Sequence, residues 1–205
     1  MMPNFTDLTG LAGVALLAAT SLLLLPGMVK IAGSPRALLM AAVLVLLLIP
    51  LGTLPLAAYV RGITGDLSIT TLVLMCSAQL RPWCGCVEVR DSHRFALLGL
   101  VVLAALGLYP MALGVGAYDP YQLGYGNLPF VVALLLLALA AWLRGYAVIT
   151  LCIALAMLAW AVGWYESDNL WDYLIDPFVS VYALASLVVF GFRIIRQPCS
   201  RGRRV

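Results

Sequence analysis

Long apolar runs separated by short polar stretches occupy almost the whole chain. Apolar and polar residues do not alternate within the runs, as the strands of a membrane barrel require, and residues 134–137 are successive leucines. A helix needs about 20 predominantly apolar residues to cross a bilayer, and cap residues, prolines and glycines mark the ends of the runs. The pattern predicts helices over residues 6–29, 35–60, 66–80, 92–116, 129–143, 147–164 and 177–195.

Two of these segments are irregular. Pro50, Gly52 and Pro55 lie in the second half of segment 35–60. Because proline has no amide hydrogen, we expect this helix to kink or unwind there, beside protein or a wet cavity. Residues 61–65 are predicted to form a turn. Segment 66–80 would be only roughly 21 Å long as a helix, against a hydrocarbon core of about 30 Å. We therefore expect about seven crossings, or six if segment 66–80 re-enters the membrane.

The composition places the chain in a membrane. Hydrophobic residues make up 64% of the 205 residues and charged residues 10%, and the mean hydropathy is +1.05. Soluble domains are usually about 45–50% apolar and about 25% charged. We predict an all-α integral membrane protein, a polytopic bundle that forms a single transmembrane helical domain over residues 1–205, with the lipid bilayer as its surroundings. The net charge of +3 does not indicate nucleic-acid binding.

The distribution of charge predicts the orientation. If seven segments cross and the N-terminus lies outside, eleven of the twelve Lys and Arg residues fall on one side. Seven of the nine acidic residues fall on the other side, together with Arg61. Short cytoplasmic loops carry an excess of Lys and Arg. The sequence therefore predicts a multi-pass protein of the bacterial inner (cytoplasmic) membrane with its C-terminus in the cytoplasm.

The predicted outer face is acidic and aromatic. It consists of two loops, residues 118–127 and 165–176. Asp168, Asp172 and Asp176 recur at every fourth position and would share one face of a helix, where like charges repel by a few tenths of a kcal/mol per pair. A divalent cation, a cationic partner or Arg61 would offset that repulsion, although capping and topology also account for acids here. The candidate binding residues are Arg61, Tyr121, Glu166, Asp168 and Asp172.

Asp66 and Asp119 are the candidate catalytic residues. Gly65-Asp66 and Tyr118-Asp119 resemble the Gly-x-Gly-Asp and Tyr-Asp pairs of intramembrane aspartyl proteases. That resemblance implies two carboxylates that share a proton and act as acid and base. This chain departs from the family pattern, because Gly62 lies one residue too early and the two motifs occur in reversed order. Helix capping by Asp66 and an Asp-Pro turn at Asp119 are the competing structural interpretations.

Metal and cofactor motifs are not recognisable in the sequence. Cys84 and Cys86 with His93 provide three ligands at most, whereas structural zinc sites use four ligands with paired Cys-x2-4-Cys spacing. The Gly-x-Ser-x-Gly elbow, the phosphate-binding glycine loop and His-Glu-x-x-His are also missing. We therefore predict neither a metal site nor a cofactor.

Three functions fit these observations. The leading hypothesis is a non-catalytic accessory or partner subunit of a cell-envelope system, whose outer acidic and aromatic face contacts a membrane or periplasmic protein. The second is a membrane enzyme that acts at the outer face on a lipid-linked substrate. The third is a small transporter, which the interrupted segment 35–60 favours, although transporters usually place ionisable groups near the middle of the membrane.

Overall fold

A computed structural model of the chain describes residues 5–23, 28, 31, 33–52, 54–80 and 91–196. Within these residues the fold is an all-α bundle with one short β-hairpin and one 3-10 helix, η1. The long helices are α1 (Phe5–Leu23), α2 (Ser34–Leu48), α4 (Ile69–Leu80), α5 (Asp91–Ala112), α6 (Leu128–Leu143), α7 (Ala147–Ala161) and α9 (Pro177–Arg196). The short elements are β1 (Pro50–Leu51), β2 (Leu54–Pro55), α3 (Leu56–Thr64), η1 (Pro120–Gly124) and α8 (Leu170–Leu174).

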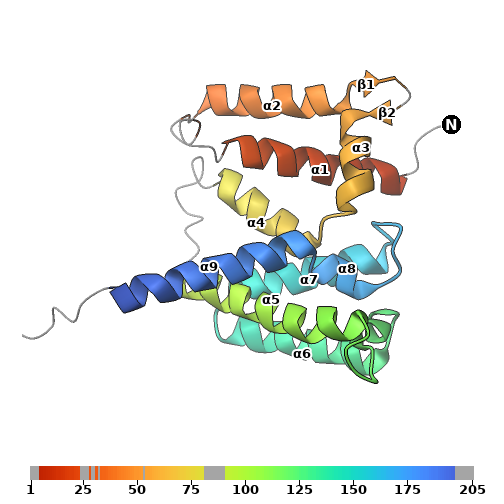
Figure 1. Ribbon diagram of the computed structural model, residues 1–205, viewed down its shortest axis with the longest axis vertical. Helices are drawn as coiled ribbons and strands as arrows, with labels where there is room; N and C mark the ends of the chain where they lie inside the picture. The colour runs from red at the N-terminus through yellow and green to blue at the C-terminus, as the bar shows by residue number, and fades with distance from the viewer. Residues whose placement is uncertain are drawn as a thin grey trace, which may run out of the picture.

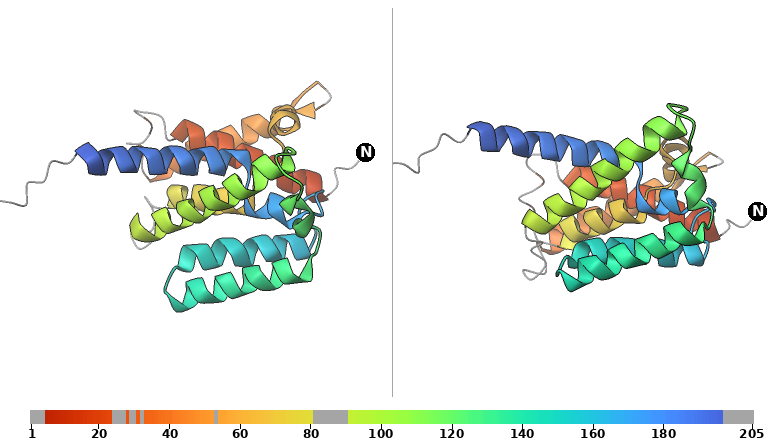
Figure 2. Two further views of the ribbon diagram at one scale, coloured as in Figure 1. Left: turned by 60° about the horizontal axis from the view of Figure 1, so that its bottom comes forward. Right: turned by 90° about the horizontal axis from the view of Figure 1, so that it is seen from below.

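The long helices run alternately between the two ends of the bundle, so that each reverses the direction of the one before (Figures 1 and 2). Helix α1 begins at one end, and the last turn of α9 lies at the other. The short elements α3, η1 and α8 gather at the end where α1 begins. We call residues 61–71, 118–127 and 165–176, which include the end of α3 and all of η1 and α8, the polar cap. The fold thus brings three distant parts of the chain together at one end.

The expected helix over residues 35–60 is two helices joined by a hairpin. Helix α2 ends at Leu48, and Pro50 and Leu51 pair with Pro55 and Leu54 in an antiparallel register. Prolines at both outer positions of the hairpin remove the amide hydrogens that a continuous helix would use. Helix α3 then lies across α1 and α2 at the end of the bundle (Figure 1). The prediction of a turn over residues 61–65 is wrong, because α3 continues to Thr64. Gly65, with a φ of 71°, ends the helix.

Several other helix ends differ from the expected bounds. Helix α5 ends at Ala112 rather than near residue 116, and α7 ends at Ala161 rather than at 164. Helix α8 is not one of the seven expected helices, and it is shorter than the helical face considered for residues 168–176. Beyond the ends of α5 and α7 the backbone amides still donate to carbonyls of the last turn of the same helix, as Leu113 does to Tyr109 and Trp164 to Ala159.

Apolar side chains cover both the interior and much of the outside of the bundle. A large core is formed by residues of all the helices from α4 through α9. A smaller core, with Val14, Ala15, Leu47 and Ala57, is formed by α1, α2 and α3. Outside the cores, large apolar side chains are exposed, with Leu103 at 69% on α5 and Val181 at 68% on α9. Buried and exposed apolar faces on the same helix are typical of a protein surrounded by lipid.

Among the described helices, two are long and apolar enough to cross a membrane by length and composition. They are residues 92–112 of α5 and 177–194 of α9. The remaining long helices contribute apolar stretches of 10–17 residues, which are shorter than the crossing length expected for the seven predicted segments. The structure therefore supports two candidate spans within an all-α bundle.

Candidate functional site

Asp176 joins the beginnings of two helices. Its Oδ1 accepts a hydrogen bond from the amide of Val179 at 2.8 Å, which caps α9 as the Asp-Pro sequence predicts. Its Oδ2 accepts from the amide of Ser68 at 2.8 Å and from the hydroxyl of Thr71 at 2.5 Å, both at the start of α4. Asp176 is 5% exposed. One buried carboxylate therefore holds the segment before α4 against α9.

The cap of α4 is Ser68, not Asp66 as the sequence suggested. The hydroxyl of Ser68 accepts a hydrogen bond from the amide of Thr71 at 3.2 Å. Asp66 instead forms a two-point ion pair with Arg61: Nε lies 2.7 Å from Oδ1 and Nη2 lies 3.0 Å from Oδ2. Nη2 of Arg61 also reaches Glu166 Oε1 at 3.4 Å. Two N–H groups of Arg61 are thus committed to Asp66, in the geometry that binds carboxylates most strongly.

Gly10 of α1 leaves room for this ion pair, which gives a testable prediction. A Cβ atom at Gly10 would lie 2.3 Å from Arg61 Nε and 2.4 Å from Asp66 Oδ1. We expect Gly10→Ala to separate α1 from the pair and to destabilise the protein by about 1–3 kcal/mol, the usual effect of overpacking. Thermal unfolding in detergent micelles measures the change.

Gly13→Ala is the matched control, because it lies on the same helix and a Cβ there would be 3.7 Å from Leu72, an ordinary contact. We expect the control to unfold within about 1 kcal/mol of the unsubstituted protein. Equal unfolding midpoints for the two variants would show that the ion pair does not require Gly10.

Asp172 is the centre of a second hydrogen-bonded group. The hydroxyl of Tyr121 donates to both carboxylate oxygens, at 2.9 and 3.1 Å, and the hydroxyl of Ser167 donates to Oδ2 at 2.5 Å. Burial raises the pKa of Tyr121, and the hydrogen bond to Asp172 raises it further. The phenol therefore remains protonated at neutral pH and continues to act as a donor. Two candidate binding residues, Tyr121 and Asp172, are in direct contact.

The expectation that Asp168, Asp172 and Asp176 share one helical face is wrong. Helix α8 spans only Leu170–Leu174, so Asp168 and Asp176 lie outside it. Asp168 lines a separate open groove of about 510 Å³ with Tyr125, Trp160 and Ala161. The backbone oxygen of Asp168 accepts a hydrogen bond from Trp160 Nε1 at 2.8 Å. The three carboxylates therefore have three different surroundings.

Sequence reasoning missed Asn169, which is fully buried. Its Oδ1 accepts from the amide of Trp171 at 2.9 Å and so caps α8, while its Nδ2 donates to the backbone oxygen of Tyr121, also at 2.9 Å. The indole of Trp171 donates to the backbone oxygen of Pro120 at 3.0 Å. These bonds fasten α8 to η1. The preference of asparagine for the residue before a helix was the available signal.

Tyr165 and Tyr173 were missed as well. The hydroxyl of Tyr165 donates to the backbone oxygen of Leu67 at 2.7 Å. The hydroxyl of Tyr173 accepts from the amide of Tyr165 at 3.1 Å and lies 3.0 Å from the backbone oxygen of Ser167, to which it donates. The two rings stack with 5.1 Å between centroids, and burial raises the pKa of both phenols. The pair ties the loop before α8 to the segment before α4.

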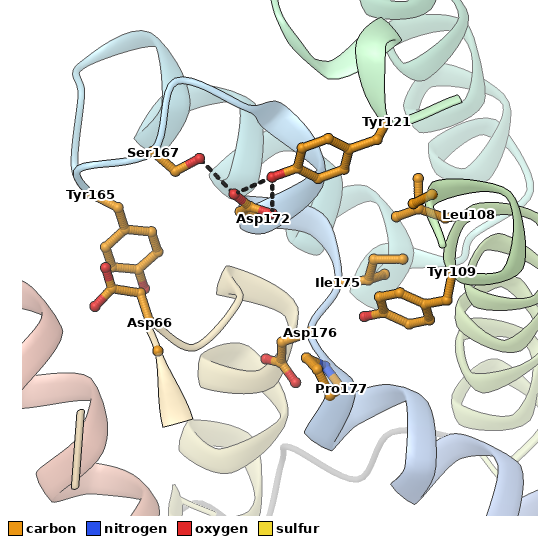
Figure 3. A pocket seen from close by; sticks show the side chains of 12 residues that line it. Asp66, Leu108, Tyr109, Tyr121, Tyr165, Ser167, Asp172, Ile175, Asp176 and Pro177 are labelled. Atoms are coloured by element: carbon orange, nitrogen blue, oxygen red, sulfur yellow. Dashed lines mark hydrogen bonds between the residues drawn. The ribbon is translucent and has the colours of Figure 1, made fainter. Parts of the chain in front are cut away.

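A cavity of about 400 Å³ lies within the polar cap. Its walls come from the segment before α4, the end of α5, η1, the α8 region and the start of α9 (Figure 3). The carboxyl-bearing residues of the lining are Asp66, Asp172 and Asp176, and the aromatic ones are Tyr109, Tyr121 and Tyr165. The sequence predicted a cavity beside the broken segment 35–60. The cavity in the structure is lined by residues from Gly65 to Pro177, none of which belongs to that segment.

The two candidate catalytic aspartates do not line this cavity together. Asp66 does, but Asp119 is not among the lining residues. Oδ1 of Asp119 accepts a hydrogen bond from the amide of Tyr121 at 2.9 Å and so caps η1. The structure therefore places Asp66 in an ion pair and Asp119 in a turn. The turn agrees with the structural interpretation of Asp119 as part of an Asp-Pro turn.

Within the described ranges, the structure contains no group of three or more His, Cys, Asp or Glu residues that could hold a metal ion. Cys84 and Cys86 lie outside those ranges. The ring of His93 packs against Tyr146, with 4.7 Å between centroids. Comparison with family models, with curated proteins and with solved structures finds no match.

Proposed function

We propose that this chain is a multi-pass protein of the bacterial cytoplasmic membrane, with the polar cap outside, and that it is a non-catalytic accessory subunit of a cell-envelope system. In this proposal the exposed rim of the polar cap binds a membrane or periplasmic protein. We define the rim by Tyr118, Tyr125, Glu166 and Asp168.

The exposed apolar surface supports the membrane location. Only 11% of the apolar window of α9 and 28% of that of α5 are buried inside the protein. Most of both helices is therefore left for another apolar environment, which lipid provides. Helix α6 adds exposed leucines at 135, 136 and 143, at 53%, 61% and 72%. Shorter helices such as α4 would cross where the bilayer thins or where flanking residues extend the apolar length.

The positions of the charges support the orientation. At the end opposite the polar cap, arginines occur near the start of α2 and of α5, in the α6–α7 turn and at the end of α9. These are Arg36, Arg94, Arg144, Arg193 and Arg196. The polar cap holds one described cation, Arg61, among six acids. The excess of arginine belongs on the cytoplasmic side.

The accessory role rests on the observation that the bonded acids inside the polar cap and the exposed residues at its rim are different sets. Asp66, Asp172 and Asp176 are committed to bonds that build the cap. Tyr118, Tyr125 and Glu166 remain at the surface, with 59%, 61% and 66% exposure. Aromatic residues are enriched at protein interfaces. Because hydrogen bonds already fix the cap beneath the exposed aromatic and acidic rim, a partner that binds the rim would lose little conformational entropy in ordering the cap.

Two measurements test the proposal. In intact cells, an impermeant maleimide should label Asp168→Cys, and it should label Arg144→Cys only after permeabilisation; the unsubstituted chain reports any reaction of the native cysteines. A photo-crosslinking residue at Tyr125 should then capture one defined envelope protein, and the same residue at Leu143, at the opposite end, should not. Labelling of Arg144→Cys in intact cells would refute the orientation. Crosslinks at Tyr125 only to lipid or to further copies of the chain would refute the accessory role.

A further inference from the structure

We propose that the cavity in the polar cap binds an organic ammonium ion, the protonated amine of a small molecule or of an aminophospholipid headgroup. The inference concerns the interior of the cap, whereas the proposed partner would contact its rim. It therefore stands or falls independently of the accessory role.

The charge of the lining favours a cation. Asp66 is balanced by Arg61, whose Nε and Nη2 both bond to it. Asp172 accepts hydrogen bonds from the hydroxyls of Tyr121 and Ser167, which are neutral donors. Among the described residues, neither Asp172 nor Asp176 has an ion pair with a lysine or arginine. Two carboxylates that lack a cationic partner beside a low-dielectric interior attract a cation and repel an anion.

Asp176 also lines the cavity and adds to its negative electrostatic potential. Its carboxylate is held by two amides and the hydroxyl of Thr71, so its position is fixed although its charge is not balanced by a described cation. In Figure 3, Asp66, Asp172 and Asp176 are distributed around the cavity instead of pointing at one spot. A ligand in the middle would interact with all three without displacing their present donors.

Aromatic rings complete the lining. Tyr109, Tyr121 and Tyr165 line the same space as the carboxylates. Two of these rings are fixed in orientation, because the hydroxyl of Tyr121 donates to Asp172 and that of Tyr165 donates to the backbone of Leu67. The face of an aromatic ring attracts an organic cation within about 6 Å, and aromatic cages recognise quaternary ammonium ligands in this way. Rings together with carboxylates therefore specify a cation that has an apolar surface.

Size and ligand spacing distinguish an ammonium ion from a metal ion. A divalent cation requires several oxygens within about 2.0–2.6 Å of one point. The described acids do not form such a group. A volume of about 400 Å³ falls within the range of small-molecule sites and greatly exceeds that of a bare ion. A small organic ammonium ion fits within such a space and would be stabilised by the carboxylates and rings around it without direct coordination.

The test uses the purified full chain in lipid nanodiscs made with phosphatidylglycerol, which has no amine. Isothermal titration calorimetry with ethanolamine should show saturable binding, and acetate should show none. We expect Asp172→Asn to weaken ethanolamine binding at least tenfold. Asp168→Asn, the same change in the same loop but outside the cavity, should alter it less than twofold.

Two further variants separate binding from folding. Tyr109→Phe keeps the ring and should bind ethanolamine within twofold of the unsubstituted protein, whereas Tyr109→Leu removes the ring and should bind at least fivefold more weakly. Both leave the bonds of Asp172 unchanged. Thermal unfolding of each variant without ligand identifies any that fails to fold, and the Tyr109 pair then decides the question if Asp172→Asn is one of these.

Nanodiscs that contain phosphatidylethanolamine identify the source of the amine. If the headgroup is the ligand, these nanodiscs should abolish ethanolamine binding by competition; if a free amine is the ligand, binding should be unchanged. Either result supports an ammonium site. Failure of ethanolamine to saturate in phosphatidylglycerol nanodiscs, equal binding of acetate, or equal weakening by Asp172→Asn and Asp168→Asn would overturn the proposal. None of these outcomes depends on a partner protein.

Discussion

Replacing Asp176 with alanine is expected to destabilise the folded protein by about 3 kcal/mol or more. The carboxylate accepts hydrogen bonds from Ser68, Thr71 and Val179, at 2.8, 2.5 and 2.8 Å. Alanine would leave all three donors without their acceptor at a position that is only 5% exposed. Each buried donor left unpaired costs roughly 1–3 kcal/mol. Denaturant unfolding in mixed micelles measures the loss.

Asp119→Ala is the matched control, since Asp119 is also an aspartate that precedes a proline and caps a helix. It accepts one hydrogen bond, from Tyr121, at 2.9 Å, and holds the start of the short η1. Loss of one cap typically costs about 1 kcal/mol. If Asp176→Ala destabilises the protein no more than Asp119→Ala does, the link between α4 and α9 is not important for stability.

The sequence predicts those parts of the fold that depend on neighbouring residues. Pro50 and Pro55 predict the interruption of the second segment because proline affects its own helix. The pairing of Arg61 with Asp66 was also foreseeable, because the two residues are only five positions apart. The start of α9 at Pro177 follows from the Asp-Pro pair.

The bonds that shape the candidate site could not be predicted in this way. Tyr165 donates to Leu67, 98 positions away, and Asn169 donates to Tyr121, 48 positions away. Periodicity carries no information about such pairs, because it describes one element at a time. The helical face proposed for Asp168, Asp172 and Asp176 failed for the same reason. Instead of continuing α8, the loop bonds to η1 through Asn169 and Trp171 and to the start of α4 through Asp176.

The acids of the polar cap illustrate how placement changes an interpretation. From the sequence, Asp66, Asp172 and Asp176 all lie on the predicted outer face: the first as a candidate catalytic residue or helix cap, the second as a candidate binding residue and the third as a helix cap. In the structure they hold the cap together and line its cavity, and the exposed rim is a different set of residues. This is why partner binding and cation binding are assigned to separate surfaces.

Gly124→Ala is expected to have the second largest effect, a loss of about 2–3 kcal/mol, because it would break the junction of η1 with α8. A Cβ at Gly124 would lie 1.7 Å from Asn169 Oδ1, 2.6 Å from its Cγ and 2.9 Å from Trp171 Cδ1. Asn169 cannot move aside easily. It is fully buried, and its amide group is bonded at both ends, to Trp171 and to Tyr121. Overpacking against a fixed group typically costs 1–3 kcal/mol, and the cap of α8 would be lost as well.

Gly107→Ala provides the comparison, because a Cβ on that face of α5 would meet no atom within 4 Å and alanine favours helix. We expect Gly107→Ala to unfold at or slightly above the midpoint of the unsubstituted protein, and Gly124→Ala well below it. Since Asn169 also bonds to the backbone of Tyr121, whose hydroxyl holds Asp172, Gly124→Ala should weaken ethanolamine binding even where the protein remains folded. A Gly124→Ala protein with unchanged stability would show that η1 and α8 are not packed as tightly as these distances require.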